Sequence, residues 1–329
     1  MPKVSICVPV FKVEKFIERC VDSICRQTLD DIEIIFINDA SPDRSWDILK
    51  ATLSKFPKRK DQVVLLENDI NSGQAVARQK CASVAMGEYL YFADADDWLQ
   101  PEMLESMYLA ALENDADIVG CQAWVYPLKG KRFLAPFSNP ESKEKSISGI
   151  ISKNKGDYSV SIALWTRLIR KSIYRQTFVS EEELEGTNRL EDFINVVKCH
   201  FFSKKVVWID KPFYNFNRRN PLSVTKTVDL QAVESEIRMI LNLERFFADR
   251  GISIFNEEMN FLKLKTKNRF IKILDIYDPR RWRSLWPELT YSHSAPLKTK
   301  IAMGLAVRKH DKILWLINWL FNCLRPLLD

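Results

Sequence analysis

Blocks of apolar and polar residues along the first 125 positions predict strands and helices in alternation. Strands are expected where β-branched and aromatic residues run together, over residues 3–11, 32–37, 63–66, 89–93 and 117–124. Helices are expected where apolar residues recur every three or four positions, over residues 14–27, 44–56, 73–86 and 102–114. Single helices between successive strands are typical of right-handed βαβ units, so the pattern predicts an α/β fold with a mostly parallel sheet.

Three carboxylates follow the fourth predicted strand. Residues 88–98 read Glu-Tyr-Leu-Tyr-Phe-Ala-Asp-Ala-Asp-Asp-Trp, which places Asp94, Asp96 and Asp97 within four positions. Such close carboxylates need a compensating cation, because otherwise each raises the pKa of the others. At the carboxyl edge of a parallel sheet they would suit Mg²⁺ or Mn²⁺ bound together with substrate phosphates. The alternative is an acidic turn before the next helix, and for Asp97 alone a helix cap is expected.

Composition narrows the class of protein. With 329 residues and 46% hydrophobic content, the chain can bury a sizeable core and is not a disordered protein. Residues 1–200 hold 26 Lys and Arg against 30 Asp and Glu, whereas the remainder holds 23 against 13. The basic excess of the C-terminal part indicates an anionic partner, with a solvated basic surface as the alternative.

Several common sites and signals are missing from the sequence. The seven cysteines form no Cys-x-x-Cys pair, which indicates buried thiols in a reducing compartment. The apolar run at residues 4–11 is too short for a signal peptide, so a cytoplasmic protein is expected. No glycine-rich phosphate loop follows the first strand, so a bound diphosphate would have to be held by a metal ion.

Four motifs in order resemble the family 2 glycosyltransferases, which have the GT-A (nucleotide-diphospho-sugar transferase, Rossmann-like) fold. The motifs are Val8-Pro9-Val10-Phe11, residues 38–43, residues 71–78 and Asp94-Ala95-Asp96-Asp97. The resemblance implies a GT-A domain over residues 1–228, with a nucleotide-binding half at 1–125 and an acceptor half at 126–228. A helical, basic extension is expected over residues 229–329.

The resemblance also implies roles for residues of the nucleotide-binding half. Asp39 matches the carboxylate that pairs with the base, and a uracil imide N–H would suit it. The alternative for Asp39 is an Asx turn before Pro42. Pro9 and Phe11 match the residues that pack on base and ribose, with strand-end core packing as the alternative.

Arg78 matches the arginine that reaches toward the nucleotide and the acidic motif, with a surface position or an ion pair as the alternative. Asp94 matches a carboxylate that faces ribose and metal, and Ala95 lies beside it in the nucleotide site. Asp96 matches the direct metal ligand.

The acceptor half is expected to supply a general base, because inverting transfer needs a group that takes the proton of the acceptor hydroxyl. The segment Leu190-Glu191-Asp192-Phe193 resembles the family's Glu-Asp-x-x-Phe segment, which implies Asp192 as the base and Glu191 as its supporting neighbour. A plain helix start with acidic residues is the alternative. Residues 164–168 and 213–219 are further landmarks, where aromatic rings could stack on sugars or simply pack in the core.

Beyond residue 229 the pattern predicts helices over residues 233–250 and 257–277. Lysines, arginines and tryptophans alternate with apolar residues over 263–286, which is typical of contact with an anionic membrane surface. A last amphipathic helix is expected over residues 311–325, too short to span a bilayer and suited to the interface or to docking on protein.

The expected function is therefore metal-assisted, inverting transfer of a sugar from a UDP-sugar to a hydroxyl of a lipid-linked or cell-surface polysaccharide acceptor. Mn²⁺ or Mg²⁺ is the expected cofactor. The expected place is the cytoplasm, peripheral at the inner face of the cell membrane. The alternatives are a GDP- or dTDP-sugar donor, a sugar-nucleotide nucleotidyltransferase, and a non-catalytic protein that binds anions or nucleic acid. No nucleic-acid partner is expected, and a homo-oligomer is left open.

Overall fold

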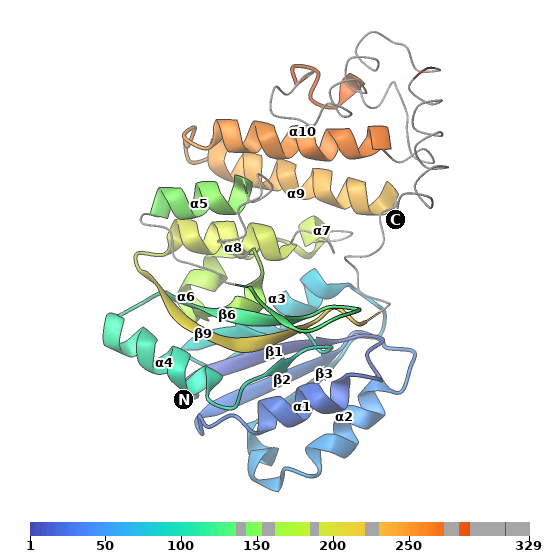
Figure 1. Ribbon diagram of the computed structural model, residues 1–329, viewed down its shortest axis with the longest axis vertical. Helices are drawn as coiled ribbons and strands as arrows, with labels where there is room; N and C mark the ends of the chain where they lie inside the picture. Colours follow the sequence, from blue (N-terminus) through green and yellow to red (C-terminus); the bar gives the residue numbers. More distant parts are fainter. Residues whose placement is uncertain are drawn as a thin grey trace. The chain divides into compact units, whose positions relative to one another are not determined.

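The computed structural model of the protein describes residues 1–135, 143–152, 162–184, 191–220, 230–272, 283–289 and 313. The chain divides into two compact units, Met1–Lys226 and Thr227–Asp329. Figure 1 colours the first unit from blue through green to golden yellow and the helices of the second unit orange.

A mixed sheet lies at the centre of the first unit. Its described strands are β1 (Val4–Val10), β2 (Ile32–Asn38), β3 (Val63–Glu67), β4 (Tyr89–Phe92), β5 (Trp98–Leu99), β6 (Ile118–Tyr126), β7 (Phe133–Ala135), β8 (Arg167–Arg170) and β9 (Val206–Asn217). They follow the order β3-β2-β1-β4-β8-β6-β9-β5, and β7 pairs with β6 off this path. The first four strands of this order are parallel, as the βαβ pattern predicts. After β4 the sheet becomes mixed, because β8 runs antiparallel to both β4 and β6.

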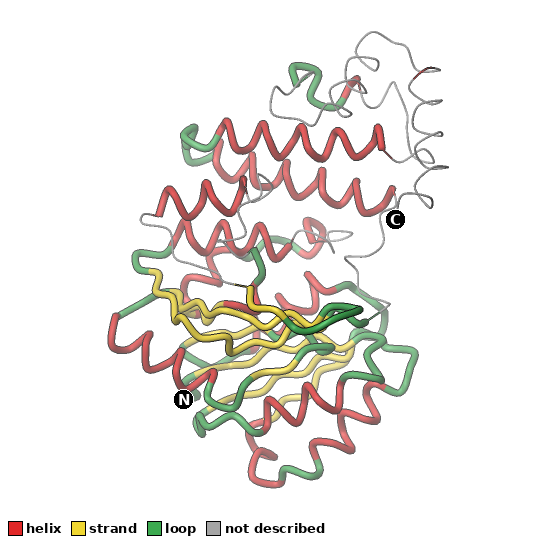
Figure 2. Tube along the Cα trace, viewed as in Figure 1, coloured by secondary structure: helices red, strands yellow, loops and turns green. Residues whose placement is uncertain are grey.

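Helices cover both faces of this sheet (Figure 2). The described helices of the unit are α1 (Ile17–Cys25), α2 (Ser45–Leu53), η1 (Pro57–Gln62), α3 (Gln74–Val84), α4 (Met103–Asn114), α5 (Lys143–Ser152), η3 (Leu164–Thr166), α6 (Lys171–Tyr174), η4 (Arg175–Thr177), α7 (Glu181–Leu184) and α8 (Glu191–Phe202). In Figure 1, α1 and α2 lie on one side of the sheet and α3, α6 and α8 on the other.

Both faces of the first strands are buried, which is why these strands read as almost unbroken apolar runs. Val4, Ile6, Val8 and Val10 of β1 belong to one large apolar core together with side chains of α1 and α4. Cys7 points to the opposite face, where it meets Cys81 of α3. Burial of both faces fixes the register of β1, since a slip of one residue would exchange the two sets of side chains.

The predicted strands and helices of the first 125 residues are all present, with ends that move by up to three residues. The short strands β5, β7 and β8, the long strand β9 and the helix α5 were not predicted. Strands of two to four residues are too short to show a period, and pairing with a neighbouring strand creates them. The six described cysteines are buried and unbonded, in agreement with the sequence.

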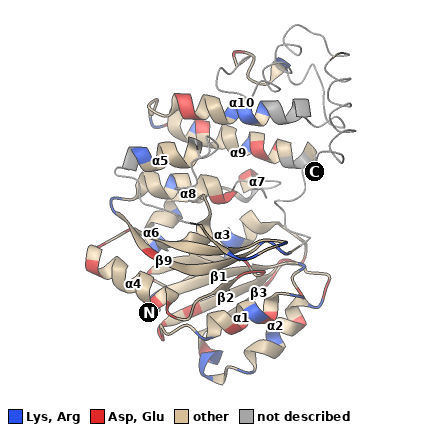
Figure 3. Cartoon of the chain, in the orientation of Figure 1, with Lys and Arg blue, Asp and Glu red and all other residues tan. Residues whose placement is uncertain are grey.

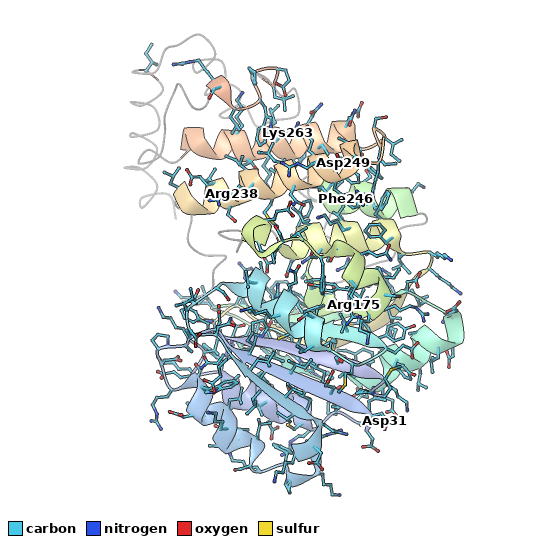
Figure 4. The ribbon with its side chains drawn as sticks, turned by 180° about the vertical axis from the view of Figure 1, so that it is seen from behind. Asp31, Arg175, Arg238, Phe246, Asp249 and Lys263 are labelled. Carbon is cyan, nitrogen blue, oxygen red and sulfur yellow. The ribbon has the colours of Figure 1, made fainter. Side chains whose placement is uncertain are left out.

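The second unit contains the pair of helices α9 (Leu230–Ala248) and α10 (Asn256–Lys272). Figure 4 labels Arg238 and Phe246 on α9, Asp249 just beyond it, and Lys263 on α10. Among the described residues, no helix is long and apolar enough to cross a membrane. The helix expected over residues 311–325 lies outside the described residues, apart from residue 313.

Three of the basic and aromatic residues that the sequence predicts to face a membrane are buried in the second unit. Lys263 and Lys267 are buried, and so is Trp286. Lys263 pairs with Glu244 of α9. The ammonium group of Lys267 donates to the carbonyl oxygens of Trp286 at 2.9 Å and Leu289 at 3.0 Å, and burial lowers its pKa to about 8. The prediction of membrane contact was wrong for Lys263, Lys267 and Trp286. Alternation of basic and apolar residues along a sequence does not show which face of a helix packs against another element.

Candidate active site

The acidic loop, defined here as residues 94–97, follows β4 at the carboxyl ends of the parallel strands, where the sequence places it. Asp94 accepts a hydrogen bond from Gln74 Nε2 at 3.1 Å and an ion-paired one from Arg78 Nη2 at 2.6 Å. Asp96 is partly exposed and accepts from Asn220 Nδ2 at 2.9 Å. Burial and the nearby Asp94 raise the pKa of Asp96 to about 6. The two carboxylates therefore lie close enough to repel each other.

Asp97 has a structural role that differs from the predicted helix cap. It is fully buried and accepts hydrogen bonds from the Tyr214 hydroxyl and the Asn217 backbone N–H, both at 2.6 Å. Helix α4 begins at Met103, and no side chain caps its first turn. The cap prediction was wrong because the pairing of β5 with β9 turns the side chain of Asp97 into the sheet.

The end of β9 holds the acidic loop through several contacts that the sequence did not predict. Asn217 Nδ2 donates to the backbone oxygen of Asp96 at 3.1 Å, and Asn220 reaches the carboxylate of Asp96. The Tyr214 hydroxyl also accepts from the backbone N–H of Asp94 at 3.3 Å. Residues 213–219 stood out in the sequence as aromatic landmarks, but nothing in the sequence singled out Asn220.

Arg78 joins the acidic loop to the predicted general base. Its guanidinium, 1% exposed, donates from Nη2 to Asp94, and from Nη1 to Glu191 at 2.5 Å and to Asp192. Burial lowers the pKa of Arg78, but the carboxylates of Asp192, Asp94 and Glu191 outweigh burial, and its pKa is raised overall. A surface position is therefore excluded for Arg78. The ion pair is present. Glu191 and Asp192 lie 113 and 114 positions after Arg78 in the sequence.

Glu191 and Asp192 start helix α8, so the short acidic motif is also a helix start. Glu191 is buried, and burial together with the adjacent Asp192 raises its pKa to about 8, against the opposing effect of Arg78. Burial also raises the pKa of Asp192, while Arg78 lowers it and Asp94 raises it further. Glu191 and Asp192 are therefore both more basic than ordinary carboxylates.

Asp39 lies just past β2, and its carboxylate organises the loop that precedes α3. It accepts from Asn68 Nδ2, from the Ser72 backbone N–H and hydroxyl, and from the Gly73 backbone N–H, all at 2.8–2.9 Å. Gly73 has a φ of 87°, which a side chain would disfavour. The loop before Pro42 is held by Asn38 instead, whose Oδ1 accepts from the Ser41 N–H at 2.9 Å.

The remaining predicted nucleotide-binding residues lie around the same sheet edge. Pro9 pairs with Ile37 in the parallel β1–β2 ladder and is partly exposed. Phe11, just beyond β1, is 37% exposed, so core packing does not account for it. Ala95 is buried within the acidic loop. The parallel strands thus bring Phe11, Asp39 and the acidic loop to one edge, as expected.

The donor set suits a hard divalent ion that substrate oxygens complete. Among the described residues, no group of three or more His, Cys, Asp or Glu side chains could hold an ion alone. Asp94 and Asp96 provide two hard carboxylates, and burial together with the negative charge of Asp94 raises the pKa of Asp96. Magnesium-like ions are commonly held by one or two carboxylates plus phosphates, so these residues fit such an ion.

Aromatic residues of the acceptor half belong mainly to the core. Trp165 stacks on Tyr214 with ring centroids 4.4 Å apart, and both side chains are buried. For this pair the structure therefore shows core packing, not an open face for a sugar. Arg218 and Arg219, which follow β9, are exposed.

A family model and a curated relative that match this chain both describe glycosyltransferases. The model of the family described as Glycosyl transferase family 2 matches residues 5–178. The uncharacterized glycosyltransferase EpsJ of Bacillus subtilis (strain 168) is 30% identical over 246 residues, which cover 72% of this chain and 67% of EpsJ.

Solved structures resemble the fold at low sequence identity. Residues 1–349 of S. aureus TarS, in complex with UDP-GlcNAc, align with a TM-score of 0.58 and 16% identity over 97% of this chain and 91% of that chain. The chain spans about half, 54%, of a longer TarS structure. Mannosyltransferase PcManGT from Pyrobaculum calidifontis, in complex with GDP-Man and Mn²⁺, aligns with a TM-score of 0.52 and 15% identity over 98% of this chain and 87% of that chain.

Proposed function

This chain belongs to glycosyl transferase family 2 and has the GT-A fold, and we propose that it catalyses metal-assisted, inverting transfer of a sugar from a UDP-sugar to a hydroxyl group. The proposed acceptor is a lipid-linked or cell-surface polysaccharide. The proposed place is the cytoplasmic face of the cell membrane, with the protein bound peripherally. Membership of a glycosyltransferase family argues against a nucleotidyltransferase and against a non-catalytic binding protein.

The observation that carries the proposal is the connection made by Arg78. One guanidinium contacts Asp94 of the acidic loop and both acidic residues at the start of α8. The predicted donor site and the predicted base are therefore separated by a single side chain. Inverting transfer needs a base close to the donor site, because the base must face the anomeric carbon from the side opposite the leaving diphosphate.

UDP is the favoured nucleotide of the donor. A TarS structure in complex with UDP-GlcNAc shares this fold, and the family resemblance assigns Asp39 to the base of the nucleotide. Three donors hold Asp39 Oδ1 and one holds Oδ2, which leaves Oδ2 able to accept a further hydrogen bond from a uracil imide. The PcManGT complex with GDP-Man keeps a GDP-sugar as the second candidate.

Asp94 and Asp96 would hold the divalent ion, Mn²⁺ or Mg²⁺. Such an ion neutralises the charge that develops on the departing diphosphate. Gln74 and Arg78 fix one oxygen of Asp94, and Asn220 fixes one oxygen of Asp96, so the carboxylates are oriented before any substrate arrives.

Asp192 would take the proton of the acceptor hydroxyl. Its raised pKa brings it nearer the working pH, which favours proton transfer. Arg78 keeps Asp192 ionised and fixes its direction. Glu191 binds the same Nη1 atom of Arg78 and so helps to hold the guanidinium beside the base.

The test is a thermal-shift panel of nucleoside diphosphates and sugar nucleotides, with and without Mn²⁺, followed by measurement of released UDP. We expect stabilisation by UDP that increases with Mn²⁺, since a ligand that binds only the folded state raises Tm. If GDP alone stabilises the protein, the proposed donor becomes a GDP-sugar. No response to any nucleotide would refute it.

Exchange of the proposed base separates binding from chemistry. We expect Asp192→Asn to keep UDP affinity and to reduce transfer by about 10²–10⁴-fold, the usual contribution of a general base. Asp61→Asn, at an exposed position outside the site, is the matched control and should behave as the unmodified protein. Retained transfer by Asp192→Asn would place the base elsewhere.

A further inference from the structure

The loop after β6 and the strand β7 that follows it expose three apolar side chains close together in the sequence. Leu128 is 64% exposed, Phe133 49% and Leu134 39%, all within seven residues. Isolated exposed apolar residues are common on soluble proteins, but a group of them marks a surface that meets something.

Cations surround these apolar side chains. Lys129, Lys131 and Arg132 belong to the same loop, and Arg218 and Arg219 lie beside it. The Arg218 backbone N–H donates to the Tyr126 oxygen at 3.0 Å, and Arg219 Nε donates to the Pro127 oxygen at 3.2 Å. The sequence contains no acidic residue in 126–135 or 216–220. We call this group of residues the basic hairpin surface: Leu128, Lys129, Lys131, Arg132, Phe133, Leu134, Arg218 and Arg219.

The cations of the basic hairpin surface are not neutralised by ion pairs. Within the part of the chain that the structure describes, none of the five is in a salt bridge. Arg132 is held in place without an acidic partner, because its guanidinium lies 4.4 Å from the centre of the Trp124 ring and donates to the Tyr126 hydroxyl at 3.0 Å. The positive charge of Arg132 is therefore held in place and can bind an anionic partner. Figure 3 draws the described lysines and arginines in blue.

We propose that the basic hairpin surface binds the surface of an anionic phospholipid bilayer. Each cation near such a surface gains attraction from the lipid phosphates, while Leu128 and Phe133 can enter the region of the acyl chains. A second copy of the chain fits poorly, since a symmetric contact would bring the five cations against their own counterparts. Nucleic acid would use the cations but leave the aliphatic side chains unexplained.

Docking there would place the bilayer beside the acidic loop. Asn217 and Asn220, which border the surface, contact Asp96. Because a lipid-linked acceptor presents its hydroxyl near the bilayer, this position suits the acceptor of the proposed function, and only this last step rests on that function. The surface differs from residues 263–286, where Lys263, Lys267 and Trp286 are buried.

The experiment places an environment-sensitive NBD fluorophore on Leu128→Cys in the full chain carrying Cys323→Ser. With phosphatidylglycerol vesicles we expect a blue shift of the emission, no shift with phosphatidylcholine, and loss of the shift at high salt. Leu112→Cys is the matched control, because Leu112 is a similarly exposed leucine on α4, before the start of β6. It should show no shift.

A second variant tests the charges. Lys129→Glu with Lys131→Glu should weaken binding to phosphatidylglycerol vesicles by at least about ten-fold, with stabilisation by UDP and Mn²⁺ unchanged. The stabilisation by UDP and Mn²⁺ is measured on the same variant. It tests the proposed function independently of vesicle binding, which tests the basic hairpin surface.

Three results would overturn the proposal. The first is vesicle binding without a shift at position 128, or no vesicle binding at all. The second is a vesicle-independent shift that rises with protein concentration, which would assign the surface to a second copy. The third is an equal shift with poly(U), which would assign it to nucleic acid.

Discussion

Neighbouring residues in the acidic loop have separate roles because their side chains point in different directions. Asp97 is buried and bonded to β9, whereas Asp96 is partly exposed beside Asp94. The sequence identified the group of carboxylates as a whole. Only the structure shows that Asp96 is accessible to a ligand whereas Asp97 is buried and holds the loop on β9.

The raised pKa of Asp96 has a consequence for stability. Between its ordinary pKa of 3.8 and about 6, the folded state keeps a proton that the unfolded chain has lost, so the contribution of Asp96 to stability falls as pH rises through this range. We therefore expect Asp96→Asn to stabilise the ligand-free protein at pH 7 by on the order of 1 kcal/mol, as is common at functional sites. Urea unfolding at pH 7 and pH 3.5 measures this, and the gain should vanish at the lower pH. A loss of stability at pH 7 would contradict the argument, and Asp61→Asn serves as the control.

The raised pKa of Asp96 also predicts that binding of the sugar-nucleotide donor depends on pH. A metal ion binds the ionised carboxylate, so protonation of Asp96 competes with it. We expect the Mn²⁺-dependent part of UDP affinity to fall below about pH 6, approaching ten-fold per pH unit, whereas metal-free UDP affinity changes little. Calorimetric titration of UDP between pH 5 and 7.5, with and without Mn²⁺, decides the matter. A flat profile would remove Asp96 from the metal site.

At the scale of elements, β9 is the part of the acceptor half that shapes the nucleotide half. Its pairing with β5 carries Tyr214 and Asn217 to the acidic loop, although more than 110 residues separate them along the chain. The longer strands and the helices of the first 125 residues were predictable, because each shows its own apolar pattern. Strands β5, β7 and β8 were not, because partners create them.

Tyr214→Phe tests the connection between β9 and the acidic loop. Loss of the hydroxyl leaves the buried Asp97 with one partner fewer, and we expect a destabilisation of about 1–3 kcal/mol. Tyr108→Phe is the control, since its hydroxyl makes only a 3.4 Å contact with Glu88. Urea unfolding of both variants provides the comparison. Equal stabilities would show that the Tyr214–Asp97 hydrogen bond contributes little.

At the scale of the whole molecule, residues 1–200 carry a small excess of acidic residues and the remainder of the chain a basic excess. The charge counts indicated an anionic partner, but the structure shows that cations of α10 make internal contacts. Membrane contact is therefore proposed for the basic hairpin surface, and it stays a prediction for residues 311–329.

Deletion of residues 311–329 tests the second of these regions. If the expected amphipathic helix lies in the interface, its removal should weaken sedimentation with phosphatidylglycerol vesicles by about ten-fold or more, while UDP binding is kept. Sedimentation equal to that of the full chain would favour docking of this segment on protein.

The sequence by itself determined the family, the order of strands and helices in the nucleotide half, and the residues that meet at the carboxyl edge of the sheet. These follow from local patterns, since periodicity and short motifs are properties of neighbouring residues. The tertiary structure alone decided that Arg78 joins Asp94 to Asp192, that Asp97 and Asn220 hold the acidic loop, and which cations stay exposed. Such contacts depend on the packing of distant segments, and burial sets both the charge state and the availability of each group.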